Sequence, residues 1–157
     1  YFTYICEIKK RRDNRFSIFY HIYNLHPHGS GHIFSMSKKS ILIVDDKEQI
    51  AKILYAYLHG DYDCMYKQNP VEALAWMQKG NVPDLIISDI RMPEMRGDEF
   101  LNHLKHNELF RGIPVVMLSS EDSTTERIRL LEEGAEDYIV KPFNPMELKI
   151  RIKKILD

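Results

Sequence analysis

The sequence from Lys38 onward predicts an α/β fold with a parallel sheet. Short apolar runs alternate with longer segments that carry apolar residues at helical spacing, and this pair of elements occurs five times. Regular alternation of strand and helix is typical of parallel sheets whose strands are joined by right-handed crossovers. The apolar run at residues 85–87 also lacks the alternation of a half-exposed strand, which indicates a strand covered on both faces.

The first strand–helix pair lies before Gly60. Residues 41–44 are a short apolar run bounded by Asp45 and Asp46, so they form the first predicted strand. A helix follows, and Gly60 is expected to end it because glycine favours the position after a helix. The apolar residues at helical spacing are expected to share the buried face of that helix: Ile50, Ile53, Leu54, Tyr57 and Leu58.

The second pair begins with a weak strand signal over residues 63–67. Asn69 and Pro70 then match an N-cap followed by a proline at the first helical position. The predicted helix runs to Lys79 and ends at Gly80.

The third pair contains the most informative stretch of the chain. A buried strand ends on Asp89, and a turn with Pro93 and Gly97 follows it. Open α/β sheets bind ligands at the carboxyl ends of their strands, which makes this carboxylate a candidate site residue. For Asp89 alone, capping of a loop explains the pattern equally well. The next helix is predicted over residues 97–106, with three apolar residues on its buried face: Phe100, Leu101 and Leu104.

The fourth pair opens with a strand over residues 114–118 that leads into Ser119. Ser123 and Glu126 then have the spacing of a capping box, which predicts the start of a helix. That helix is expected to end before Gly134.

The fifth pair combines a strand over residues 137–140, which leads into Lys141, with the last helix of the sequence. Asn144 and Pro145, with Glu147 after them, are typical of a helix start. The predicted buried face of this helix comprises Leu148, Ile152, Ile155 and Leu156.

Composition excludes several classes of protein. A length of 157 residues suggests one domain with spare sequence at one end, and the net charge of −1 gives no general case for nucleic-acid or membrane binding. Cys6 and Cys64 have neither metal-site nor disulfide-framework spacing, which favours a reduced, cytoplasmic environment. No apolar run is long enough to span a bilayer.

Residues 1–37 differ in composition from the rest of the chain. The first part is rich in aromatic residues and contains a basic run at residues 9–12, and residues 25–35 have the glycine, proline and histidine content of a linker. Met36 precedes the first predicted strand and resembles a natural start. We expect an N-terminal extension derived from a tag or upstream sequence, or a flexible one, followed by a domain over residues 38–157. An aromatic arm that packs on a partner and a basic arm that contacts nucleic acid are the alternatives.

Polar residues follow four of the five predicted strands directly. Asp45, Asp46, Asp89, Ser119 and Lys141 all fall at the carboxyl edge of the sheet, where the fold can bring them together. Each has a simple structural explanation alone, such as a helix cap, a loop hydroxyl or a surface lysine. Their common position favours a site.

With these residues in place, the chain from residue 38 to 157 resembles the receiver domain of two-component response regulators. The resemblance rests on Asp45-Asp46, on Asp89 followed by Met-Pro-x-x-x-Gly, on Ser119 and on Lys141-Pro142-Phe143. It implies a doubly wound, flavodoxin-like (βα)5 fold, with a five-stranded parallel sheet in the order 2-1-3-4-5. It also implies that Asp89 accepts a phosphoryl group from the phosphohistidine of a sensor histidine kinase. Serine replaces the more usual threonine at residue 119, which we interpret as equivalent chemistry.

The resemblance implies Mg²⁺ as cofactor. Asp46 and Asp89 would supply carboxylate ligands, Asp45 would lie close by or act through water, and the backbone carbonyl of Arg91 would be a further ligand. A hard divalent cation offsets the repulsion between a carboxylate and an incoming phosphoryl group, and Mg²⁺ needs few protein ligands because it keeps several waters.

The phosphate-binding and switch residues also follow from the resemblance. Lys141 would contact one oxygen of the transferred group and Ser119 would donate a hydrogen bond to another. The Lys141–Pro142 bond is expected to be cis. Tyr138 is the aromatic expected to turn inward after phosphorylation, although its position also suits a half-buried strand tyrosine.

Arg91 and Glu121 each lie two residues beyond a site residue, Asp89 or Ser119. We expect both to line the rim through which a hydrolytic water arrives and to tune the lifetime of the phosphoryl group. Opposite charges could pair across this rim.

The implied partners are a sensor kinase and an output domain or effector, controlled through the fourth helix, fifth strand and fifth helix. Residues 133–148 resemble the receivers of winged-helix transcription regulators, which typically dimerise through this face when active. A weak, phosphorylation-dependent homodimer is therefore expected, with no membrane or direct nucleic-acid binding by this domain. The charges available for reciprocal pairing are Arg127, Glu136, Asp137, Lys149 and Arg151.

Such a protein is not a conventional enzyme, because it catalyses only its own aspartyl phosphorylation and dephosphorylation. Two other functions share part of this pattern. Haloacid-dehalogenase-type phosphatases need a second aspartate two residues after the nucleophile, and Arg91 stands there. A receiver fold that docks partners without phosphorylation is the remaining alternative.

Overall fold

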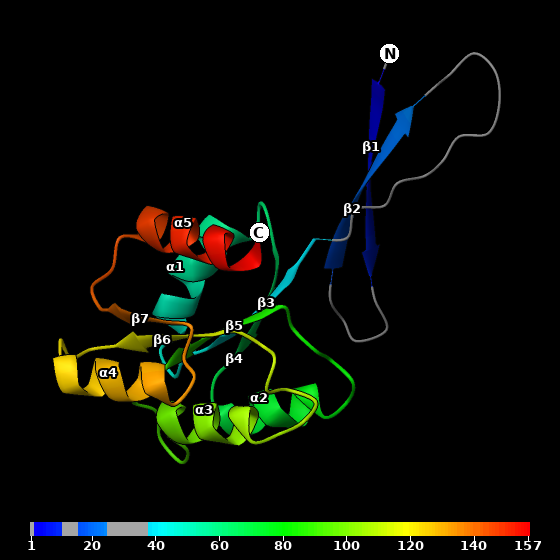
Figure 1. Ribbon diagram of the computed structural model, residues 1–157. Coiled ribbons are helices and arrows are strands. Elements are labelled where there is room, and N and C mark those ends of the chain that lie inside the picture. The colour runs from blue at the N-terminus through cyan, green and yellow to red at the C-terminus, as the bar shows by residue number, and fades with distance from the viewer. Residues whose placement is uncertain (1, 11–15, 25–37) are drawn as a thin grey trace. The chain divides into compact units, whose positions relative to one another are not determined.

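The computed structural model describes residues 2–10, 16–24 and 38–157. The chain divides into two compact units, Tyr1–Lys38 and Lys39–Asp157. In the first unit, β1 (Phe2–Lys10) pairs antiparallel with β2 (Phe16–Asn24) (Figure 1). Composition did not indicate this pair of strands, and the expected linker at residues 25–35 lies outside the described residues.

The second unit is built on a parallel sheet of five strands. Their order is β4-β3-β5-β6-β7, which is the order 2-1-3-4-5 counted within this unit, so the predicted fold is confirmed. The strands are β3 (Ser40–Val44), β4 (Asp63–Lys67), β5 (Leu85–Asp89), β6 (Val115–Ser119) and β7 (Asp137–Val140).

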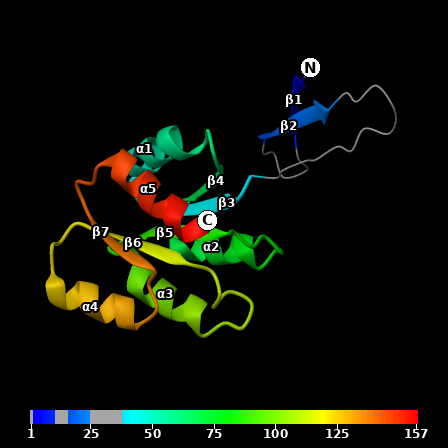
Figure 2. The ribbon, with the colours of Figure 1, turned by 45° about the horizontal axis from the view of Figure 1, so that its top comes forward.

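Helices cover both faces of this sheet (Figures 1 and 2). On one face lie α1 (Glu48–Leu58) and α5 (Pro145–Leu156). On the other lie α2 (Pro70–Met77), α3 (Gly97–Lys105) and α4 (Thr124–Glu132). Each face has its own hydrophobic core, because successive strand residues point to opposite sides. Ile41, Ile43 and Ile87 thus pack towards α1 and α5, and Leu42 and Ile86 towards the other helices.

The helix starts agree with the sequence signals. Asn69 caps α2 by accepting a hydrogen bond from the Glu72 amide at 2.8 Å, and Pro70 is the first residue of the helix. Asn144 caps α5 in the same way through the amides of Met146 and Glu147. These side chains satisfy amides that have no partner within the helix.

Two details of the predicted helices were wrong. In α1, Ile53 and Tyr57 are each 42% exposed, and Ala51 is buried beside Leu54 and Leu58 instead. The buried stripe is therefore centred closer to Ala51, whose small side chain gave little hydrophobic signal. In α2, the last helical residue is Met77 rather than Lys79.

None of the helices in the described part of the chain combines the length and the apolar character that crossing a membrane requires.

Candidate functional site

An acidic cluster lies at the carboxyl edge of the central strands. Asp89 is the last residue of β5, and Asp45 and Asp46 directly follow the neighbouring strand β3. Oxygen atoms of the three carboxylates lie within 4.8 Å of one another. Asp45 and Asp89 are 0% and 2% exposed. Burying several carboxylates together is unfavourable unless a cation compensates them.

Lys141 supplies one such cation. Its Nζ lies 2.5 Å from Asp89 Oδ1 and 2.9 Å from Asp45 Oδ2. Burial lowers the pKa of Lys141, but the hydrogen bonds to both carboxylates outweigh that effect and raise it above its usual value, so the ammonium stays charged. The Lys141–Pro142 bond is cis, as the resemblance implied.

The two aspartates after β3 differ in whether a carboxylate oxygen remains free to bind a ligand. Asp45 Oδ1 accepts a hydrogen bond from the Lys47 amide at 2.8 Å and Oδ2 accepts one from Lys141, and burial raises the pKa of this carboxyl. Asp46 Oδ1 is buried and lacks a hydrogen-bond partner. A buried, unpartnered carboxylate oxygen beside two further carboxylates matches the oxygen ligands that Mg²⁺ prefers. The residues present therefore fit the implied cation.

Backbone contacts hold the cluster in place. The Tyr66 hydroxyl, at the end of β4, donates a hydrogen bond of 2.9 Å to the carbonyl oxygen of Asp45. The Gly97 amide donates one of 2.8 Å to the Ile90 carbonyl oxygen. A Cβ atom at Gly97 would overlap the backbone carbonyl of Asp89, so only glycine allows α3 to start this close to the end of β5.

Ser119 and Tyr138 lie together beside this cluster. Ser119 Oγ accepts a hydrogen bond from the Glu121 amide at 3.0 Å and lies 3.1 Å from the Glu121 carbonyl oxygen. The Tyr138 hydroxyl lies 2.9 Å from the same carbonyl oxygen and 3.0 Å from Glu126 Oε2. With only 6% of its surface exposed, Tyr138 is turned into the molecule.

The rim residues also meet. Arg91 Nη2 and Glu121 Oε1 form an ion pair of 2.6 Å, with about half of each side chain exposed to solvent. The opposite charges of these two residues therefore pair, as the sequence suggested. An effect of this pair on the phosphoryl group, and a ligand role for the Arg91 carbonyl, stay predictions.

Residues 41–153 match the family described as "Response regulator receiver domain". The chain belongs to this family. Because the match covers nearly all of the second unit, the receiver domain is the part of the chain in which the acidic cluster lies.

Curated relatives of this receiver domain have several kinds of name. The chain is 39% identical over 122 residues to "Phosphate regulon transcriptional regulatory protein PhoB" of Pseudomonas aeruginosa, covering 77% of this chain and 53% of that protein. It is 41% identical over 125 residues to "Histidine kinase P4" of Formosa agariphila, covering 80% of this chain and 9% of that protein. The chain thus spans about half of one relative and a small part of the other.

Solved receiver structures superpose on the chain as well. The chemotaxis response regulator CheY4 of Vibrio cholerae matches with a TM-score of 0.71 and 32% identity, over 76% of this chain and 100% of that one. A CheY-like receiver domain protein of Methanospirillum hungatei matches with a TM-score of 0.70 and 33% identity, over 77% and 95% of the two chains.

Two residues of this region had no predicted role in the site. Tyr66 was assigned only to the weak strand β4, and Glu126 only to a helix start. Their site contacts join residues that are distant in sequence, so no local pattern signals them. The register that places Tyr66 beside Ile43, two residues before Asp45, becomes visible only in the sheet.

Proposed function

We propose that this receiver domain accepts a phosphoryl group from the phosphohistidine of a sensor histidine kinase onto Asp89. The observation that carries the proposal is the position of Asp89. It is a buried carboxylate at the end of the central strand, within an acidic cluster of metal-site dimensions and 2.5 Å from the Lys141 ammonium.

The reaction exchanges one bond to phosphorus for another. A carboxylate oxygen of Asp89 forms the new P–O bond while the P–N bond to the kinase imidazole breaks, and the imidazole keeps the electron pair and takes up a proton. Lys141 lies close enough to Asp89 to hold an oxygen of the transferred group as a point charge. Ser119 has a hydroxyl proton that can turn to a second oxygen.

Asp46 and Asp89 are the residues that would hold Mg²⁺, with Asp45 beside them. When bound, the ion neutralises charge that develops on the phosphoryl oxygens. Asp46 suits direct ligation because its Oδ1 has no other partner. Asp45 suits a supporting role because Lys47 and Lys141 already engage both of its oxygens.

The output follows from the neighbours of Ser119. When its hydroxyl turns to the phosphoryl group, it leaves the Glu121 carbonyl oxygen, which the Tyr138 hydroxyl also contacts. Tyr138 belongs to β7 and also contacts Glu126 of α4, so the change reaches these two elements. An output domain or effector would bind the face that they form with α5. A cytoplasmic location suits a partner of a sensor kinase.

Incubation with acetyl phosphate and Mg²⁺, followed by intact mass measurement, tests the proposal. The wild-type chain should gain the mass of one phosphoryl group, and Asp89→Asn should not, because an amide is a poor nucleophile. Asp89→Ala should in addition weaken Mg²⁺ binding, since one carboxylate ligand is lost.

Asp61→Asn is the matched control, because it removes an exposed carboxylate that pairs with Lys149. Asp61 precedes β4 and so lies at the edge of the sheet opposite to Asp89. This variant should gain mass as the wild type does. A normal mass gain in Asp89→Asn would refute the assignment. No gain in the wild-type chain would favour docking without phosphorylation.

A further inference from the structure

A carboxylate of α4 lies against the hydroxyls of both expected switch residues. Glu126 Oε2 is 3.0 Å from the Tyr138 hydroxyl and 3.4 Å from Ser119 Oγ. Ser119 and Tyr138 belong to neighbouring strands, β6 and β7, whereas Glu126 lies in the first turn of α4. The Glu126 side chain thus connects α4 to both switch residues.

The local structure of α4 aims this carboxylate inward. The Glu126 amide donates a hydrogen bond of 3.2 Å to Ser123 Oγ, which caps the helix and fixes its first turn. In a complete capping box, the glutamate side chain would return to the backbone of the cap residue. Here the half-buried Glu126 side chain extends towards Tyr138 instead.

The hydroxyl protons around Glu126 are limited in number. Ser119 and Tyr138 can each donate a single proton, and the acceptors beside both are the Glu121 carbonyl oxygen and Glu126 Oε2. If the Ser119 proton turns to a phosphoryl oxygen, Tyr138 remains to serve the two acceptors. A hydrogen bond to a carboxylate is stronger than one to a neutral carbonyl, so the contact between Tyr138 and Glu126 should then dominate.

We propose that Glu126 is a positioning residue that holds the Tyr138 ring turned into the molecule and so favours the conformation that accompanies a phosphoryl group on Asp89. This inference rests on the proposed function and adds a residue of α4 to it. The Arg127 guanidinium, 5.4 Å from the centre of the Tyr138 ring, covers the ring from the same helix. Burial raises the pKa of the Tyr138 phenol, and the Glu126 carboxylate raises it further, so the phenol keeps the proton it donates.

The inference makes the affinity for a phosphoryl mimic depend on Glu126. A ligand that binds only when the Tyr138 ring is turned inward has an apparent affinity proportional to the fraction of molecules in that conformation. Glu126→Gln keeps the size of the side chain and removes its charge. We expect this change to weaken binding of beryllium fluoride about tenfold, which corresponds to about 1.4 kcal/mol.

Calorimetric titration of the full chain with beryllium fluoride in the presence of Mg²⁺ tests this in a double-mutant cycle. The cycle compares the wild type, Glu126→Gln, Tyr138→Phe and the double variant. Because the phenylalanine has no hydroxyl to hold, Glu126→Gln should change the affinity less than about twofold in that background. Equal weakening in both backgrounds would overturn the inference, because Glu126 would then act independently of Tyr138.

Glu132→Gln is the control, since it removes the same charge from an exposed position of α4 and should leave the affinity unchanged. Tyrosine ring resonances in ¹³C-labelled protein give a second readout, with Tyr138 identified by the signal missing from Tyr138→Phe. That signal should shift in Glu126→Gln before any ligand is added, and an unchanged signal would overturn the inference.

The same titration distinguishes failure of the proposed function from failure of the role of Glu126. A wild-type chain that does not bind beryllium fluoride would overturn the proposed function together with the inference. A wild-type chain that binds, with additive effects in the cycle, would overturn the role of Glu126 alone.

Discussion

At the scale of single residues, the position of the acidic cluster depends on the close approach of the start of α3 to the end of β5. Gly97 starts α3 against the carbonyl of Asp89, and its amide is bonded to Ile90. Glycine is needed here for steric reasons rather than for its backbone freedom, because Gly97 does not have a positive φ. The position of the Asp89 carboxylate therefore depends on the absence of a side chain eight residues later.

Gly97→Ala should reduce phosphorylation by acetyl phosphate and lower the free energy of unfolding by about 1–3 kcal/mol, the usual cost of overpacking. The added methyl group must displace the backbone at Asp89 and Ile90. Urea unfolding and the rate of mass gain measure the two effects. Gly60→Ala is the control, since a Cβ atom there meets nothing within 4 Å. Equal behaviour of the two variants would contradict the steric explanation.

The ion pair between Arg91 and Glu121 should act on rate rather than on stability. With about half of each side chain exposed, the pair contributes roughly 0–1 kcal/mol to folding. Arg91→Glu and Glu121→Arg should each change the rate of dephosphorylation, and the charge-swapped double variant should move that rate back towards the wild type. Decay of the phosphorylated mass with time gives the rate. Identical decay in all four proteins would show that the rim has no such role.

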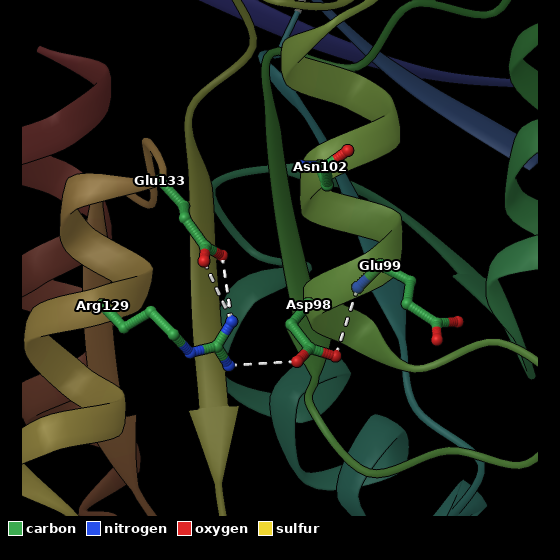
Figure 3. Close-up of a pocket in the computed structure, with 5 residues that line it drawn as sticks. All are labelled: Asp98, Glu99, Asn102, Arg129 and Glu133. Carbon is green, nitrogen blue, oxygen red and sulfur yellow. Dashed lines mark hydrogen bonds and ion pairs between the residues drawn. The ribbon is translucent and has the colours of Figure 1, made fainter.

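At the scale of elements, a bridge of charged side chains joins α3 to α4. Asp98, in the first turn of α3, pairs with Arg96 Nε at 3.0 Å. It also pairs with Arg129 Nη2 of α4 at 3.0 Å (Figure 3). Arg129 also pairs with Glu133, the residue that directly follows α4. Asp98, Arg129 and Glu133 line a polar groove together with Glu99 and Asn102. The bridge restrains α4, the helix that carries Glu126.

The bridge predicts a pH-dependent contribution to stability. Burial raises the pKa of Asp98, but the hydrogen bonds from Arg96 and Arg129 outweigh it and lower the pKa below its usual value of 3.8. A carboxyl whose pKa is lower in the folded state stabilises the fold above the unfolded pKa, and that contribution is lost as the pH falls below it. Asp98→Asn should therefore cost about 1 kcal/mol at neutral pH, a small value because both arginines are partly exposed.

Urea unfolding of wild type and Asp98→Asn at several pH values measures this difference. It should be constant from neutral pH down to about the usual aspartate pKa and shrink below that pH. Glu133→Gln, which breaks only its pair with Arg129, should have the smaller effect. A difference that does not change with pH would mean that the lost stability has another cause than the charge of Asp98.

At the scale of the whole molecule, the described hydrophobic cores lie entirely within the second unit. Their residues range from Ile41 to Leu156, and the contact boundary between the two units falls at Lys38 and Lys39. Removal of residues 1–37 should therefore leave the melting temperature and the rate of phosphorylation nearly unchanged. Thermal unfolding and intact mass measure both. A melting temperature lowered by several degrees would make the first unit part of the fold of the receiver domain.

Several of the charges proposed for a homodimer already form ion pairs within one chain. Arg151 pairs with Asp137 at 3.0 Å and with Glu147 at 2.8 Å, and Lys149 pairs with Asp61 at 2.6 Å. A reciprocal pair between Arg151 and Asp137 of two chains would have to exchange with the internal one. Replacing an internal ion pair by one between two chains adds little free energy of association. We therefore expect dimers through α4, β7 and α5 to be weak and to need the phosphoryl mimic.

Sedimentation with and without beryllium fluoride measures the association. Arg151→Glu and Asp137→Arg should each abolish it, because each places like charges opposite one another across a two-fold interface. An equimolar mixture of the two variants should dimerise again, since both pairs are then complementary between chains while each chain keeps an internal repulsion. A monomeric wild type under all conditions, or a mixture that stays monomeric, would contradict this interface.

Local sequence patterns were sufficient for the five strands of the second unit, for most helix starts and for the position of polar residues at the carboxyl edge of the sheet. Apolar runs and caps such as Asn69 depend on neighbouring residues only, so they can be recognised in order along the chain. The meeting of Asp45, Asp46, Asp89 and Lys141 could also be expected, because the carboxyl ends of parallel strands lie at one edge.

Packing between distant segments decided what these patterns left open. The buried face of α1 depends on how the helix is rotated against the sheet: Ala51 lies on that face, whereas Ile53 is 42% exposed. Tyr66 contacts Asp45 across a sequence separation of 21 positions, and Tyr138 contacts Glu126 across one of 12 positions. Such contacts are set by strand register and helix rotation, which exist only once the sheet and its helices have assembled.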